Sequence, residues 1–208
     1  MTRQTSELIV VRHGQSTWNR DHLFTGQHDS PLTGLGREQA VRLADRCREL
    51  APEAVATSDL ARARETGTIV AAALGLPPPV CLLELRERWN RTLTGMTQEQ
   101  VEARYPGRMA DWRDGPSTDL PGDGERFEDF RARVLYGLRA AARLAPVVLV
   151  VAHAGLFRVL GEATHSGLGA GLANTAGRRI AVTGSELTDA GDPFAAAPDL
   201  PHTGAGDL

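Results

Sequence analysis

Two histidines occupy nearly the same local setting in this sequence of 208 residues. His13 lies in VVRHG and His153 in VVAHAG, so each follows a short apolar run and precedes a small residue that lets a ligand approach the backbone. No H-x-x-x-H spacing or third ligand stands nearby, so a local metal site is not indicated. Either histidine alone would fit a hydrogen-bonded residue at a strand end equally well. Together they predict a nucleophile or an anion pocket.

Arginines beside these histidines strengthen the prediction of an anion pocket. Arg12 is adjacent to His13, and the guanidinium group presents a planar fork of donors that matches phosphate oxygens. Arg62 falls one turn into a predicted helix whose N-terminus also favours anions, while Arg64 is the alternative on the same helix and would otherwise be a solvated surface residue. All 23 basic residues are arginine, which excludes mechanisms that need a lysine amine.

The elements that must position these residues alternate along the chain. Strands are predicted at 7–11, 53–57, 80–83, 147–151 and 179–183, and helices at 33–50, from a cap at Ser58 or Asp59 to 73, at 125–145 and at 154–163. This alternation predicts an α/β fold with three layers, α/β/α, around a mainly parallel sheet. Ligands bind beyond the carboxyl ends of such strands, so His13, Ser58, Glu87 and His153 are expected in one cleft.

The domain organisation follows from the length and from changes in composition. We expect a single domain over residues 1–187 with a small loop-rich lid insertion at about 88–124, where aromatics and breakers alternate without a sustained period. Residues 188–208 are rich in Ala, Gly, Pro and Asp and are expected to form a disordered acidic tail.

Charge, cysteines and hydropathy limit the class of protein. A net charge of −3 and a pI near 6.1 argue against a nucleic-acid partner. Cys47 and Cys81 stand far apart and indicate neither a disulfide framework nor a zinc site. The N-terminal residues lack a signal-peptide pattern, and the most apolar stretch, 146–157, is too short to span a membrane. A cytoplasmic enzyme is therefore expected.

A longer series of motifs adds a resemblance. The segment RHGQSTWNRDHLFTGQHDSPLTGLGREQA at 12–40 resembles the opening of the histidine phosphatase superfamily, in particular its cofactor-dependent phosphoglycerate mutase branch. The series continues in the same order with SDLARARET at 58–66, LRE at 85–87, PGDGERFEDFRARV at 121–134, VVLVVAHAGLFRVL at 147–160 and LANT at 172–175. The resemblance covers most of residues 7–183.

The resemblance implies a role for each matched residue. His13 would be the nucleophile that takes the phosphoryl group, and Arg12, Arg62 and His153 would surround the phosphoryl oxygens. The rest of the implied phosphate-binding set is Asn19, Thr25, Gly26 and Ala154.

The resemblance also implies a glutamic acid after the third strand, which protonates the leaving alkoxide. Glu87 is the first choice because the family's following glycine falls eight residues on, at Gly95, and Glu84 is the alternative.

The region after the acid departs from the family pattern. Many phosphatases of the family carry a G-x-W-E-G-like stretch, whereas this chain reads RWNRTLTG at 88–95, and its Glu87-Arg88 pair resembles the mutases. The mutases also use a lysine and a longer insertion, which this chain lacks. Pocket residues are sought among Trp89, Asn90, Arg91, Met96 and Trp112, although the two tryptophans fit a lid core equally well.

Three functions are therefore weighed. The first is a metal-independent phosphatase that hydrolyses a small phosphorylated metabolite through a phosphohistidine on His13, with no cofactor. The second is a phosphoglycerate-type phosphomutase, and the third is a phospho-ligand binding protein of the same fold without turnover. No nucleic-acid or membrane partner is expected, and the sequence leaves a homodimer open.

Overall fold

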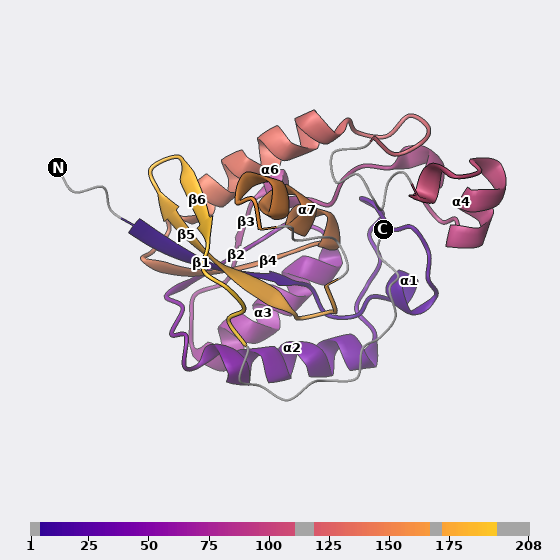
Figure 1. The fold of residues 1–208 in the computed structure, drawn as a ribbon. Helices are drawn as coiled ribbons and strands as arrows, with labels where there is room; N and C mark the ends of the chain where they lie inside the picture. The colour runs from indigo at the N-terminus through magenta and orange to yellow at the C-terminus, as the bar shows by residue number, and fades with distance from the viewer. Residues whose placement is uncertain (1–4, 111–118, 167–171, 195–208) are drawn as a thin grey trace.

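The computed structural model describes residues 5–110, 119–166 and 172–194. Six strands form one sheet in the order β3-β2-β4-β1-β5-β6 (Figure 1). Strands β1 to β4 run parallel, whereas β5 is antiparallel to β1 and β6 is antiparallel to β5. Their bounds are β1 Thr5–Arg12, β2 Ala54–Thr57, β3 Val80–Cys81, β4 Val147–Ala152, β5 Gly177–Thr183 and β6 Glu186–Asp189. The sheet is mixed but mostly parallel, as the alternation predicted.

Helices cover both faces of the sheet. Helices α2 (Gly34–Cys47) and α3 (Ala61–Leu74) lie on one face, and α6 (Phe127–Ala141) and α7 (Ala154–Ala163) lie on the other (Figure 1). The shorter helices are α1 (Thr17–Arg20) and α4 (Gln98–Arg104), and single 3-10 turns occupy Leu83–Leu85 and Arg91–Leu93. The expected three-layer α/β/α architecture is confirmed.

The core sits in two layers because side chains alternate across a strand. Ile9 and Val11 of β1 pack with Leu43 of α2 and Val70 of α3 on one face. On the other face, the neighbouring residues of β1 and β4 pack with aromatic and aliphatic side chains of α6 and α7, namely Leu8, Val10, Val148, Val150, Phe130, Leu138 and Phe157. Both faces of β1 and β4 are therefore buried, which explains their continuous apolar sequence.

The strand register places the two histidines at one edge of the sheet. Arg12 and Ala152 form the last pair between β1 and β4, so His13 and His153 each follow at the carboxyl end. The backbone N–H of His13 donates to the carbonyl of Ala152 at 3.0 Å. Thr57 of β2 pairs with Val151, which brings Ser58 to the same edge. Parallel pairing of these strands thus gathers distant residues, as expected.

Two elements in the middle of the chain differ from their predictions. The N-cap of α3 is Leu60, which makes no side-chain cap, so the expected cap at Ser58 or Asp59 is wrong. A carboxylate oxygen of Asp29, distant in sequence, accepts the N–H of Ala61 at 2.6 Å instead. The strand predicted at 80–83 is shorter, because Leu83–Leu85 already turn into a 3-10 helix.

The C-terminal part also differs from the prediction. Strand β6 crosses the boundary expected at residue 187, and Phe194 is buried in the core beneath the guanidinium of Arg46, whose Cζ lies 3.8 Å from the ring centroid. The expected disorder is therefore wrong for residues 188–194, because an antiparallel pairing with β5 and an aromatic anchor hold them in place. Residues 195–208 lie outside the described residues.

The lid insertion at 88–124 forms a small core together with Phe24. Phe24, Leu93, Val101, Met109 and Leu120 form a separate buried cluster, with Met96 packed against it. Trp89 is 43% exposed, so it is not part of this core, and Trp112 lies outside the described residues. The insertion is therefore less loop-like than expected, because α4 buries Val101 in this cluster. No described helix is long and apolar enough to cross a membrane.

The two cysteines provide a chemical test of this fold. Cys47 is buried between α2 and the sheet, and burial raises the pKa of its thiol to about 12, whereas Cys81 is exposed. Because the thiolate is the reactive form, we expect the native protein to react with one equivalent of a disulfide reagent at about pH 8, and the second thiol to react only after denaturation. Rapid labelling of both thiols in the native protein would contradict the placement of α2.

Candidate active site

His13 is held in a form that suits nucleophilic attack. Its ring is fully buried, and Nδ1 lies 2.7 Å from the carbonyl oxygen of Gly14, which can only accept a hydrogen bond. Nδ1 must therefore carry the proton, and Nε2 keeps its lone pair. Arg62 Nε donates to this nitrogen at 3.1 Å, which agrees with the same tautomer. The hydrogen bonds thus prepare Nε2 to attack an electrophile.

The backbone around His13 is fixed by side chains from α2, from α3 and from the loop before β5. Asn174 donates to the His13 carbonyl at 2.9 Å, Thr66 Oγ1 accepts from the Gly14 N–H at 3.1 Å, and Gln39 Oε1 accepts from the Gln15 N–H at 2.8 Å. A Cβ at Gly14 would overlap the carbonyl of Gly36 in α2, so a glycine is required there. These three polar side chains were not expected as site residues from the sequence, although Asn174 lies in the LANT motif.

Arg62 connects His13 to the loop between α1 and α2. Besides the bond to His13, it donates to the carbonyls of Gly26 at 2.7 Å and His28 at 2.8 Å, and its side chain is 1% exposed. Gly26 has φ +49°, and a Cβ there would overlap the side chain of Asn90, so only glycine fits. Arg64 is exposed on the same helix. The structure therefore brings Arg62, and not Arg64, to His13.

His153 and Arg12 lie at the same edge of the sheet. The rings of His13 and His153 are 5.2 Å apart between centroids, and both side chains are buried. His153 is the N-cap residue of α7, and its Nε2 lies 2.7 Å from the hydroxyl of Ser58. Arg12 is also buried and donates to the carbonyl of Leu172 at 2.6 Å. Two buried arginines beside two histidines provide the positive charge that phosphoryl oxygens prefer.

The remaining predicted phosphate-binding residues are buried around this group. Asn19 of α1 accepts from the Ser16 N–H at 3.1 Å and from Asn174 at 3.4 Å. Thr25 donates to the carbonyl of Leu23 at 3.2 Å, and Ala154 is the first residue of α7. Each of the three is at most 6% exposed.

Glu87 is oriented by two backbone groups. Its Oε1 accepts from its neighbour Arg88 N–H at 2.7 Å, and its Oε2 accepts from the Gly155 N–H in the first turn of α7 at 3.0 Å. Gly155 is two residues from His153, so the carboxyl group lies at the helix end that His153 begins. Glu84 instead lies in the 3-10 turn with its Cβ against Gly137 of α6. The structure therefore brings Glu87, and not Glu84, toward the histidine pair.

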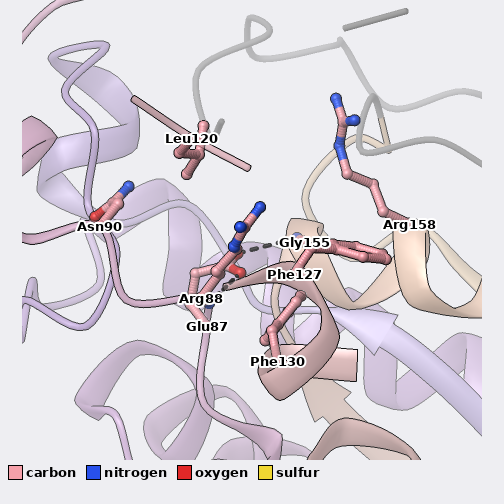
Figure 2. A pocket seen from close by; sticks show the side chains of 8 residues that line it. All are labelled: Glu87, Arg88, Asn90, Leu120, Phe127, Phe130, Gly155 and Arg158. Carbon is pink, nitrogen blue, oxygen red and sulfur yellow. Dashed lines mark hydrogen bonds between the residues drawn. The ribbon is translucent and has the colours of Figure 1, made fainter. Parts of the chain in front are cut away.

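A pocket opens beside Glu87 (Figure 2). Its walls are largely apolar, and two of its charged side chains, Arg88 and Arg158, were not among the pocket residues expected from the sequence. Arg88 forms an ion pair with Asp119 at 2.6 Å. Burial, together with the nearby charge of Arg88, lowers the pKa of Arg158 to about 10 against the opposing effect of Glu87. The lining residues are Glu87, Arg88, Asn90, Leu120, Phe127, Phe130, Gly155 and Arg158.

Comparison with known proteins agrees with the geometry. The profile of the histidine phosphatase superfamily (branch 1) matches residues 8–189, which include His13, Arg62, Glu87 and His153. The chain belongs to branch 1 of the histidine phosphatase superfamily. Within the described residues of this histidine phosphatase superfamily member, no group of three His, Cys, Asp or Glu side chains could hold a metal ion.

Relatives of this superfamily member include both phosphatases and a mutase. The chain is 32% identical over 161 residues to a metal-independent phosphoserine phosphatase of Arabidopsis thaliana, covering 76% of this chain and 68% of the relative. It is 36% identical over 163 residues to a glucosyl-3-phosphoglycerate phosphatase of Mycolicibacterium vanbaalenii, covering 74% and 71%. It is also 36% identical over 162 residues to a 2,3-bisphosphoglycerate-dependent phosphoglycerate mutase of a Chelativorans species, covering 74% and 78%.

Two solved structures share this fold. A mycobacterial glucosyl-3-phosphoglycerate phosphatase in complex with VO3 superposes with a TM-score of 0.78 at 26% identity, covering 89% of this chain and 98% of that one. Bacillus stearothermophilus YhfR gives a TM-score of 0.78 at 25% identity, covering 96% and 100%. Membership in the superfamily therefore leaves the choice between phosphatase and mutase to other arguments.

The contact between Gly155 and Glu87 gives a prediction for this superfamily member. A Cβ at Gly155 would overlap the Glu87 carboxylate, so Gly155→Ala should displace that side chain. We expect about a tenfold or greater loss in the rate of turnover of a phosphorylated substrate, since small displacements of groups in a site are costly. Gly34→Ala, at an open position at the start of α2 with no positive φ, controls for the added methyl group, with thermal unfolding measured for both variants. Unchanged steady-state rates for Gly155→Ala would contradict the described position of Glu87.

Proposed function

We propose that this protein is a phosphatase that hydrolyses a small-molecule phosphomonoester through a phosphohistidine on His13, without a metal or another cofactor. The observation that carries the proposal is the tautomer of His13. Its buried Nε2 keeps a lone pair and faces Arg62, with a second buried histidine 5.2 Å away between ring centroids. A phosphomonoester carries about −1.5 to −2 charges near neutral pH, which suits this surrounding of cations.

In the first step, the Nε2 lone pair attacks phosphorus, the P–N bond forms, and the P–O bond to the leaving group breaks. In the structure Arg62 Nε donates a hydrogen bond to His13 Nε2. As Nε2 attacks phosphorus, the same N–H would donate to a phosphoryl oxygen instead. Arg12 and His153 would add donors to the other phosphoryl oxygens. Transfer of a phosphoryl group depends mainly on such positioning and charge.

The proton balance requires an acid on the leaving-group side. Glu87 in its protonated form would donate to the leaving alkoxide as the P–O bond breaks. In the second step, Glu87 as carboxylate would accept a proton from water while the water oxygen attacks phosphorus. The P–N bond then breaks, and inorganic phosphate and a neutral imidazole result.

Two features of the sequence favour a phosphatase over a phosphomutase. A mutase must keep the phosphohistidine while excluding water, yet this chain contains no lysine and has a short insertion at about 88–124. The relatives at 32–36% identity include both types of enzyme, so a phosphoglycerate-type mutase is the second candidate. A small phosphorylated metabolite is the proposed ligand in either case, and a cytoplasmic location remains a prediction.

A substrate panel tests the proposal. Free phosphate would be measured from phosphorylated sugars, acids, amino acids and nucleosides, with a chelator present. Rapid release from one class of monoester is expected. Fast isomerisation of 3-phosphoglycerate with a bisphosphate primer and little free phosphate would instead establish the mutase. Tight phosphate binding without turnover of any ester would indicate the binding protein.

A further inference from the structure

Arg133 of α6 divides its guanidinium donors between the segment that carries Glu87 and the carboxylate of Glu125. It donates five hydrogen bonds: to the carbonyls of Glu84 at 2.9 Å, Arg86 at 2.7 Å and Glu87 at 2.9 Å, and to the two carboxylate oxygens of Glu125 at 2.6 and 2.7 Å. A guanidinium group has five N–H donors in a fixed planar arrangement, so its donor capacity is filled. Three of these donors hold the backbone within residues 84–87.

Glu125 fixes the segment on the other side of Glu87. Its carboxylate also accepts the backbone N–H of Trp89 at 3.1 Å, and its own backbone N–H donates to the Trp89 carbonyl at 2.7 Å. The Glu125 carbonyl accepts from Arg88 Nε at 2.9 Å. Arg133 and Glu125 are 22% and 15% exposed, so solvent competes only in part for this ion pair. Together they connect residues 84–89 to the start of α6.

The segment needs such support because little regular structure holds it. Strand β3 ends at Cys81, and a single 3-10 turn at Leu83–Leu85 is the only regular element between β3 and Glu87 in the described chain. The Glu87 carboxylate itself is oriented by the N–H groups of Arg88 and Gly155. A shift of the Glu87 carbonyl would therefore move the carboxyl group relative to α7 and His153.

We propose that Arg133, paired with Glu125, is a positioning residue for the proton donor Glu87. It acts through the carbonyls of residues 84, 86 and 87 and does not touch the reacting atoms. The inference rests on the proposed function, because it assigns Arg133 to the step in which Glu87 protonates the leaving group. Charge alone would not suffice, since lysine cannot reproduce five directed hydrogen bonds.

The test compares two kinds of ester, an alkyl phosphate that needs a proton on its leaving group and p-nitrophenyl phosphate, which needs little help. The variants are Arg133→Gln, Arg133→Lys, Glu125→Gln, Glu87→Gln and the double variant Glu87→Gln/Arg133→Gln. Arg131→Gln is the matched control, because Arg131 lies on the same helix and pairs with Glu162 at 3.2 Å, away from residues 84–89. Thermal unfolding identifies the variants that fold. If Arg133→Gln does not fold, Arg133→Lys still tests the inference.

We expect Arg133→Gln and Arg133→Lys to lower kcat for the alkyl phosphate about 10- to 100-fold, with less than about a threefold loss for p-nitrophenyl phosphate. Glu125→Gln should show the same selectivity, and Arg131→Gln should match the wild type. In the Glu87→Gln background, Arg133→Gln should add almost nothing, because both changes remove the same function.

Other results would overturn the inference. Equal losses for both esters would reduce Arg133 to a general structural role, and so would a full additional loss in the Glu87→Gln background. Full activity of Arg133→Lys would show that charge alone is enough. Failure of the proposed function looks different: the wild type would release no phosphate, or Glu87→Gln would show no selectivity, and both proposals would then fall.

Discussion

Replacement of His13 by alanine should lower phosphate release by about 10⁴-fold or more, because the variant has no nitrogen at the position of Nε2. The ring of His13 is buried and bound through both nitrogens, so no neighbouring side chain can simply take its place. His153 Nε2 already forms a hydrogen bond with Ser58 Oγ at 2.7 Å, so His153 is not placed to act as a replacement nucleophile. The rate should be measured as free phosphate from the preferred ester of the panel.

His165→Asn serves as the control for this experiment. His165 follows α7 with φ +54°, a backbone conformation that asparagine tolerates better than most residues, and it lies outside the proposed site. The control should keep wild-type activity, and phosphate binding by His13→Ala, measured by calorimetry, should show that the pocket persists. A residual rate above about one per cent in His13→Ala would place the nucleophile elsewhere.

Replacement of Glu87 by glutamine should separate substrates by their leaving groups. Glutamine keeps the size of the side chain but cannot donate a carboxylic proton, so alkyl phosphates should lose about 10²- to 10³-fold in kcat. p-Nitrophenyl phosphate, whose phenolate leaves without protonation, should lose less than about tenfold. The measurement is the ratio of kcat values for the two esters, taken across the pH range in which the wild type is active.

Glu84→Gln is the matched control, since Glu84 was the alternative acid and lies against Gly137 of α6. It should leave the ratio of the two kcat values unchanged. Equal losses for both esters in Glu87→Gln would mean that Glu87 has another role, and a selective loss in Glu84→Gln would assign the acid to that residue.

The sequence was sufficient for the architecture because the core follows short-range patterns. Continuous apolar runs such as Val147–Ala152 predict strands buried on both faces, and helical periodicity located α2 and α6 to within a few residues. The parallel arrangement then implied that His13 and His153 meet at one edge. Their local sequences are alike because both residues follow a buried strand at its carboxyl end.

Features that depend on distant partners could not be predicted in this way. The cap of α3 comes from Asp29, and the last strand and Phe194 are held by β5 and Arg46. The interactions of Asn174 and Arg133 likewise go to backbone carbonyls of other segments, which no side-chain pattern reveals. Trp89 was considered for the lid core, yet it is 43% exposed, since Glu125 fixes its backbone and leaves the ring outside.

Trapping the phosphoenzyme tests the role of His13 most directly. The wild type would be mixed with a radiolabelled phosphomonoester, quenched in alkali, where phosphohistidine persists, and digested with trypsin. Cleavage after Arg12 releases residues 13–20, HGQSTWNR, whose single histidine is His13, whereas His153 falls in residues 144–158. Acid-labile label is expected on the peptide 13–20, and none on that peptide in His13→Ala. Label on the peptide 144–158, or turnover without any labelled histidine, would contradict this role of His13.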